Sequence, residues 1–134
     1  KKIGLYRTYH GVTLSLPVQM ASAWAWSDTE HVRKNRIEYD EKYQTAISCL
    51  ESTVKIDRPD GGFYIWLKLP CDDQEFAKLL YSNESILSLP GSYLGKENNG
   101  LNPGKGFLRL AIVHDIETIY KAFSAVNKTL LSFK

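Results

Sequence analysis

The sequence lacks an apolar run of the roughly 18 residues that a membrane-spanning helix needs, and it lacks the pattern of a secretory signal peptide. The chain begins with Lys1 instead of methionine, which is compatible with a piece of a longer protein. Its two cysteines, Cys49 and Cys71, are too few for a disulfide framework, so we expect reduced thiols and a cytoplasmic protein. The three histidines are far apart and share no ligand-like spacing with the cysteines, so we expect no metal site.

The sequence also has little net charge. Its 17 basic and 15 acidic residues leave a formal charge of +2, which gives no broad positive field for nucleic acid. Without a basic groove, the aromatic residues favour core packing over a base-stacking surface. The length of 134 residues, with 43% hydrophobic and 24% charged residues, is typical of one globular domain with a buried core.

The first part of the chain is predicted to be mainly helical. Residues 1–16 are expected to hold a helix end and an irregular loop, and Pro17 then begins a short apolar helix over 17–26. The segment SDTE at 27–30 matches a capping box, which predicts a long helix to about residue 53. The apolar positions of this helix recur at helical spacing: Val32, Tyr39, Tyr43, Ala46, Ile47 and Leu50. The opposite face is expected to be solvated: Arg33, Lys34, Glu38, Glu41 and Lys42.

The second part alternates short strands with helices. Strands are predicted at 54–56, 63–70, 86–89 and 107–113, with the turn sequence PDGG before the second of them. Asp72 with Glu75 predicts the start of one helix, and Asp115 predicts the start of the last. The last helix has one apolar face: Ile116, Ile119, Phe123, Val126 and Leu130. The order predicts an α/β (α+β) fold, with helices packed on one face of a small mixed or antiparallel sheet.

Two common catalytic motifs are excluded by their spacing. The segment GLNPGKGF at 100–107 has the glycines and lysine of a phosphate-binding loop, but its first two glycines are separated by three residues instead of four. Gly106 also follows Lys105 where that motif needs Ser or Thr, and the segment precedes a strand rather than a helix. Ser15 and Ser92 have no histidine at a recognisable spacing, so a hydrolase triad is not supported.

Arg109 lies within the apolar segment FLRLAIV and has no acidic neighbour in the sequence. An unpaired buried guanidinium is costly, so this arginine needs water or a partner. One interpretation is an edge-strand arginine that faces water or pairs with a distant acid. The other is a carboxylate site, because the planar guanidinium can donate two parallel hydrogen bonds to a carboxylate. The glycines of the preceding loop would let the backbone approach such a ligand closely.

Four motifs, in order and spacing, resemble the carboxyl-terminal part of class I/II pyridoxal-phosphate-dependent aminotransferases of fold type I. They are LYRTYHG with LPVQMASAWAW, then PDGGFYIWLKLP, ILSLPGSYLG and NPGKGFLRLAIV. Each motif is loose by itself, but the four in this order are specific and extend over nearly the whole chain. The YRTYHG, GGFY and PGSYLG elements are most similar to those of N-succinyldiaminopimelate aminotransferases.

The resemblance implies roles for particular residues. The family's arginine in the strand after the NPG-like loop binds the substrate α-carboxylate, and its counterpart here is Arg109. Tyr9, Ser15 and Tyr93 are expected near the active site. The loop from Tyr9 to Ser15 resembles the region that reaches toward the second subunit of a homodimer, although packing on its own large domain is an open alternative.

The resemblance also implies pyridoxal 5'-phosphate as cofactor, bound mainly by a large domain that this chain lacks. The segment that carries the family's Schiff-base lysine is not present, and Lys1 and Lys2 have no matching context. Residues 1–26 are then expected to link from the large domain, and residues 27–134 to form the small domain.

The expected function is amino-group transfer between an amino acid and a 2-oxo acid, with succinyldiaminopimelate of lysine biosynthesis as a candidate substrate. The 134-residue chain alone is expected to be inactive, because it lacks the lysine. Two alternatives stay open. One is a free-standing, non-catalytic module that binds a small molecule or another protein, and the other is a structural domain with a surface arginine.

Overall fold

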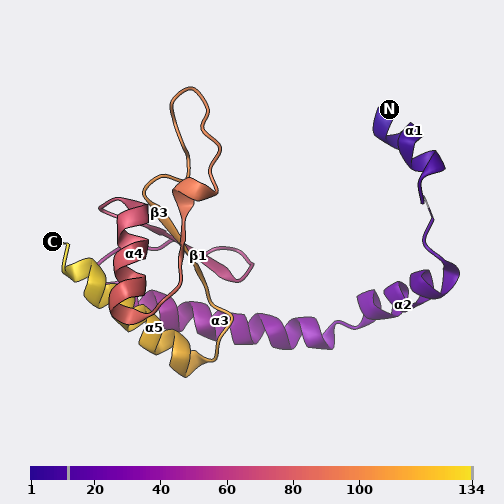
Figure 1. Cartoon of the computed structure of the whole chain (residues 1–134). Helices are drawn as coiled ribbons and strands as arrows, with labels where there is room; N and C mark the ends of the chain where they lie inside the picture. Colours follow the sequence, from indigo (N-terminus) through magenta and orange to yellow (C-terminus); the bar gives the residue numbers. More distant parts are fainter. Residues whose placement is uncertain (12, 134) are drawn as a thin grey trace. The chain divides into compact units, whose positions relative to one another are not determined.

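The computed structural model describes residues 1–11 and 13–133, and the chain divides into two compact units, Lys1–Arg36 and Ile37–Lys134. The first unit contains α1 (Lys2–Tyr9), α2 (Leu16–Ser27) and the beginning of α3 (Glu30–Leu50) (Figure 1). Neither α1 nor α2 buries any of its residues. The short apolar helix predicted from Pro17 is confirmed as α2.

The predicted capping box at 27–30 is wrong. Ser27 is the last residue of α2, and its hydroxyl donates a hydrogen bond to the carbonyl of Trp24. The side chain of Asp28 takes its place, because Oδ1 accepts a hydrogen bond from the backbone N–H of Glu30 at 3.1 Å. An aspartate near a helix start is as favourable as a serine, and the two lie side by side in this sequence.

The second unit begins within α3, whose residues Tyr43, Ala46 and Leu50 are buried as predicted. The helix ends at Leu50 instead of residue 53, and the carbonyl of Leu50 accepts hydrogen bonds from the N–H groups of Thr53 and Val54. Residues 54–56 therefore follow a helix end and form no strand, which makes that prediction wrong.

The prediction for Lys42 on α3 is also wrong. It was expected on the solvated face of the helix, but it is buried. Its ammonium lies 2.5 Å from the carboxylate of Glu38 and over the ring of Tyr39. The long apolar stem of a lysine can be buried while its charge keeps a partner, so burial is compatible with this residue type.

The three strands of the second unit are β1 (Tyr64–Lys68), β2 (Leu89–Pro90) and β3 (Phe107–Ala111). Both pairings are antiparallel and the order is β1-β3-β2, so β3 is the middle strand. The strand predicted at 86–89 is reduced to its last residue and Pro90, because pairing begins only where Leu89 meets Arg109. A short 3₁₀ helix, η1 (Gly91–Tyr93), follows β2.

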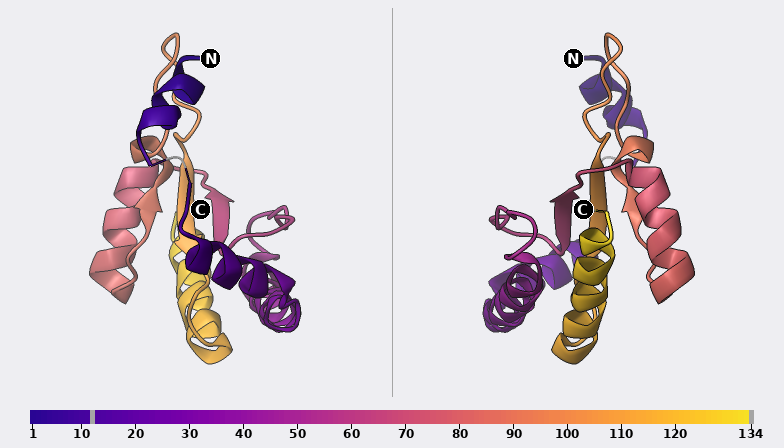
Figure 2. Two further views of the ribbon diagram at one scale, coloured as in Figure 1. Left: turned by 90° about the vertical axis from the view of Figure 1, so that its right-hand side faces the viewer. Right: turned by 90° about the vertical axis from the view of Figure 1, so that its left-hand side faces the viewer.

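Two further helices complete this unit. The helix α4 (Asp73–Glu84) begins as predicted, since Asp72 accepts hydrogen bonds from the N–H groups of Gln74 and Glu75. The helix α5 (Ile116–Leu131) is capped by Asp115, which accepts from Thr118. Figure 2 shows α4 and α5 alongside each other next to the strands. Neither these nor the other helices among the described residues are long and apolar enough to cross a bilayer.

The core of the second unit lies on one face of the sheet. Alternate strand residues, Ile65 and Leu67 on β1 with Leu108 and Leu110 on β3, join side chains from α3, α4 and α5 in one buried cluster. Each such side chain contributes about 1.5–3 kcal/mol when it is fully buried. The predicted fold class is confirmed, with the helices on one face of a small antiparallel sheet. The other strand residues point to the opposite face, called the open face here: Tyr64, Trp66, Lys68, Phe107, Arg109 and Ala111.

Candidate functional site

Arg109 lies in the middle of the open face. It belongs to the central strand, where it pairs with Trp66 on β1 and Leu89 on β2. Its neighbours Leu108 and Leu110 are buried on the helix side, so Arg109 points the other way and is half-buried. The interpretation of Arg109 as an edge-strand residue is therefore wrong, because strands lie on both sides of it.

The guanidinium of Arg109 has an aromatic neighbour but no acidic one. Its central carbon lies 4.3 Å from the centre of the Tyr64 ring, a cation–π stacking distance. The backbone carbonyl of Tyr64 accepts a hydrogen bond from the Tyr43 hydroxyl at 3.2 Å, which ties this strand to α3. Among residues 1–11 and 13–133, no carboxylate forms an ion pair with Arg109. The arginine is thus positioned, and its donors are available to an anion.

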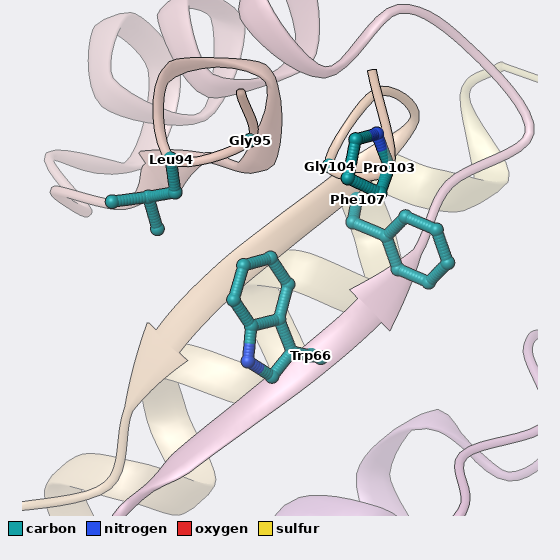
Figure 3. A pocket seen from close by; sticks show the side chains of 6 residues that line it. All are labelled: Trp66, Leu94, Gly95, Pro103, Gly104 and Phe107. Carbon is teal, nitrogen blue, oxygen red and sulfur yellow. The ribbon is translucent and has the colours of Figure 1, made fainter. Parts of the chain in front are cut away.

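A pocket of about 390 Å³ opens on the same face, beside Arg109. It is lined by Trp66, Leu94, Gly95, Pro103, Gly104 and Phe107. Figure 3 shows Trp66 between Leu94 on one side and Pro103 and Phe107 on the other. The rings of Trp66 and Phe107 meet edge to face, with centroids 6.4 Å apart. Trp66 is both a wall of the pocket and the cross-strand partner of Arg109, so the two features adjoin.

The loops that wall this pocket are held together by Asp73, at the start of α4. Its carboxylate is fully buried and accepts hydrogen bonds from the N–H of Ser92 at 2.8 Å and of Gly106 at 3.1 Å. Burial acts to raise the pKa of Asp73, but the hydrogen bonds from Ser92 and Gly106 outweigh it and leave the pKa below its ordinary value. Asp73 is therefore ionised at neutral pH and joins the two loops.

Asn102 adds a second link between the same loops. Its amide nitrogen donates to the carbonyl of Ser92 at 2.8 Å, and its amide oxygen accepts from the N–H of Gly104 at 2.9 Å. A Cβ on Gly104 would lie 1.9 Å from the carbonyl oxygen of Gly91, so only glycine permits this approach. Asp73 is a site residue that was not predicted from the sequence. The pair Asp72–Asp73 did carry a signal for it. One aspartate is sufficient to cap α4, so the second is available for another role.

Tyr9, Ser15 and Tyr93, the other predicted site residues, do not lie on the strand that carries Arg109. Tyr93 is in η1, is exposed, and donates its hydroxyl to the side-chain oxygen of Gln74 at 3.2 Å. Tyr9 is the exposed last residue of α1, and Ser15 precedes α2 without a side-chain capping bond. Both belong to the first unit, whereas Arg109 and Tyr93 belong to the second. Val12, within the loop assigned to subunit contact, lies outside the described residues. The roles of Tyr9, Ser15 and Tyr93 stay predictions.

Comparison with known proteins identifies the family. The sequence model of the family described as "Aminotransferase class I and II" matches residues 4–126. The chain belongs to this family. Among solved structures, an aminotransferase from Neisseria meningitidis is 43% identical with a TM-score of 0.86, over 94% of this chain and 32% of that one.

Two further relatives are more distant. Transaminase BacF from Bacillus subtilis is 27% identical over 86% of this chain and 29% of its own length. A structure described as a probable N-succinyldiaminopimelate aminotransferase from Thermus thermophilus is 28% identical with a TM-score of 0.65, over 78% of this chain and 27% of that one. The chain thus spans about one third or less of the length of these relatives.

Proposed function

We propose that this chain is the substrate-recognising small domain of an aminotransferase that transfers an amino group between an amino acid and a 2-oxo acid. Arg109 binds the α-carboxylate of the substrate. The observation that carries the proposal is a half-buried guanidinium, positioned on Tyr64 in the centre of an open sheet face, with no carboxylate partner among the described residues. Two findings support the proposal. The chain belongs to the family, and it spans about one third or less of the length of the relatives it matches.

The geometry explains why arginine suits this position. A carboxylate that approaches the open face can accept two parallel hydrogen bonds from the planar guanidinium, each with charge assistance. The stacking on Tyr64 limits the side-chain motions that binding would otherwise have to restrict.

Pyridoxal phosphate is the cofactor that the family implies, and it supplies the electron sink for transamination when bound. The described residues do not form a site for it by themselves. The one buried lysine among them, Lys42, is paired with Glu38 on α3. The guanidinium of Arg109 is suited to a substrate carboxylate. We therefore assign the cofactor site, the Schiff-base lysine and much of the homodimer interface to the rest of the full-length protein.

An activity screen of the full-length protein tests this proposal. The panel contains alanine, leucine, phenylalanine, aspartate and N-succinyldiaminopimelate as amino donors, with 2-oxoglutarate as acceptor. The last donor is included because of the motif resemblance and the similarity to the Thermus thermophilus protein. We expect turnover with at least one donor. Absence of turnover with every donor, in protein that has bound the cofactor, would favour a non-catalytic binding module.

The 134-residue chain is the control for that screen. Mixed with pyridoxal phosphate, it is expected to show neither turnover nor a borohydride-trapped adduct at one particular lysine. Trapping at a single lysine together with turnover would contradict the assignment of the lysine to the rest of the protein.

A further inference from the structure

We propose that the apolar pocket beside Arg109 holds the side chain of the amino acid whose carboxylate Arg109 binds, and that it selects aromatic and branched aliphatic side chains. This inference rests on the proposed function and narrows its substrate class. It assigns Trp66 and Leu94 as residues that determine specificity.

Trp66 and Arg109 are directly opposite each other on neighbouring antiparallel strands and share the open face. Side chains in such a pair have Cβ atoms about 5 Å apart. Arg109 leans over Tyr64, whereas Trp66 packs against Phe107, so the guanidinium and the pocket follow each other along the sheet. An amino acid that spans this step along the sheet would place its carboxylate on Arg109 and a side chain of several carbons on Trp66.

The loops that wall the pocket are held in place by hydrogen bonds. Asp73 and Asn102 tie together the two loops that form its upper wall. A Cβ on Gly95 would lie 1.9 Å from the side-chain oxygen of Asn102, so the loops already meet at the closest distance that glycine allows. A volume of about 390 Å³ is at the small end of the range for ligand sites and exceeds what one amino-acid side chain needs.

The walls of the pocket are mainly apolar. Of the described residues that line the pocket, none is charged, and Trp66, Leu94, Pro103 and Phe107 present apolar surface. A second carboxylate in this space would lose hydration without gaining a counter-charge. Lys68 is on the open face opposite Phe107, but it is exposed and does not line the pocket. The pocket thus favours phenylalanine and leucine over aspartate or N-succinyldiaminopimelate.

The experiment measures kcat/KM of the full-length protein for phenylalanine, leucine and alanine in the wild type and in four variants. In the wild type it also includes aspartate and N-succinyldiaminopimelate. Trp66→Ala is expected to lower kcat/KM for phenylalanine about 10- to 100-fold while changing that for alanine less than about threefold, because only the larger donor reaches the pocket. Leu94→Ala should act in the same direction and guards against a folding defect in the first variant. Tyr81→Ala is the matched control, since Tyr81 is an exposed aromatic residue on α4 outside the pocket.

The outcomes separate this inference from the proposed function. A drop confined to the large donors supports the pocket. An equal drop for all three donors, or no drop in either variant, overturns it, as does a preference of the wild type for aspartate or N-succinyldiaminopimelate. If Arg109→Lys lowers kcat/KM for every donor in the same assay, the proposed function stands even when the pocket assignment fails. If Arg109→Lys has no effect on any donor, the proposed function itself is wrong.

Discussion

The two units of this chain differ in whether their apolar side chains are buried. In the second unit, apolar residues repeat with the period of each element and meet in one buried cluster. In the first unit, α2 is apolar on all sides and buries nothing, with Trp24 and Trp26 among the most exposed large side chains of the chain. A helix of that kind is normally covered by other parts of a protein.

Among the residues that the structure describes, those of the second unit alone form a hydrophobic core. Its fold is explained by residues within it, from the capped helices to the central strand that carries Arg109. In the first unit, by contrast, the large apolar side chains of α1 and α2 are exposed. That fits a chain spanning about one third or less of the length of its relatives.

The largest effect is expected from removing a core aromatic side chain. Phe76 on α4 is fully buried in the second unit, so Phe76→Ala should lower the free energy of unfolding of the 134-residue chain by about 3–5 kcal/mol. Trp26→Ala removes a larger side chain from the first unit, but 87% of it is exposed, so the expected change is within about 0.5 kcal/mol. Denaturant titration of both variants measures this contrast. Similar losses of unfolding free energy in the two variants would contradict the described difference between the units.

A smaller effect is expected where the loops of the second unit meet. In Gly104→Ala the new methyl group would lie 1.9 Å from the Gly91 carbonyl oxygen, which belongs to backbone and cannot rotate away. We expect a loss of about 1–3 kcal/mol in unfolding free energy. Gly61→Ala is the control, because nothing lies within 4 Å of the added carbon there. If both alanines are tolerated equally in thermal unfolding, the loops are not packed as described.

The Asp73 carboxylate gives a pH-dependent effect on the same loops. Asn can accept from only one of the two N–H groups that Asp73 satisfies, so Asp73→Asn should cost about 1–3 kcal/mol at neutral pH. Because the pKa of Asp73 is lowered in the folded protein, its stabilisation is complete above the unfolded value of about 3.8 and is lost as the pH falls through the folded value. Unfolding measured from pH 7 to pH 2 should therefore show the gap between wild type and variant narrowing below about pH 4.

Asp60→Asn provides the matched acidic control for that series, since Asp60 is an exposed turn residue. It should follow the wild type at every pH. A constant gap between wild type and Asp73→Asn from pH 7 to pH 2 would mean that the charge of Asp73 does not hold the loops.

Much of the fold could be predicted from the sequence, because its signals are local. Asp72 and Asp115 were identified as caps from their spacing to the next apolar residues, and both accept the expected N–H bonds. The predictions failed where local preference and tertiary context disagree. Residues 54–56 are β-branched in part, but the end of α3 uses the N–H of Val54, and no strand is available to pair with them among the described residues.

The candidate site was predicted in part for the same reason. An arginine between two leucines is visible in the sequence, and its need for a partner follows from charge alone. Its place on the central strand, the stacking on Tyr64 and the adjoining pocket depend on strand order and register, which join residues distant in the sequence. Asp73 was missed because its partners, Ser92 and Gly106, are also distant from it in the sequence.

The most direct test of the carboxylate site compares two quantities, kcat/KM and the free energy of unfolding, in Arg109 variants of the full-length protein. Lysine keeps the charge but loses the planar pair of donors, so Arg109→Lys should lower kcat/KM by about 10- to 100-fold, or about 1.5–3 kcal/mol. Arg109→Ala should lower it further. The free energy of unfolding should change by about 1 kcal/mol or less, because the arginine loses only its contact with Tyr64. An unchanged kcat/KM, or one that falls only in step with unfolding, would show that Arg109 is structural and that the carboxylate site is wrongly assigned.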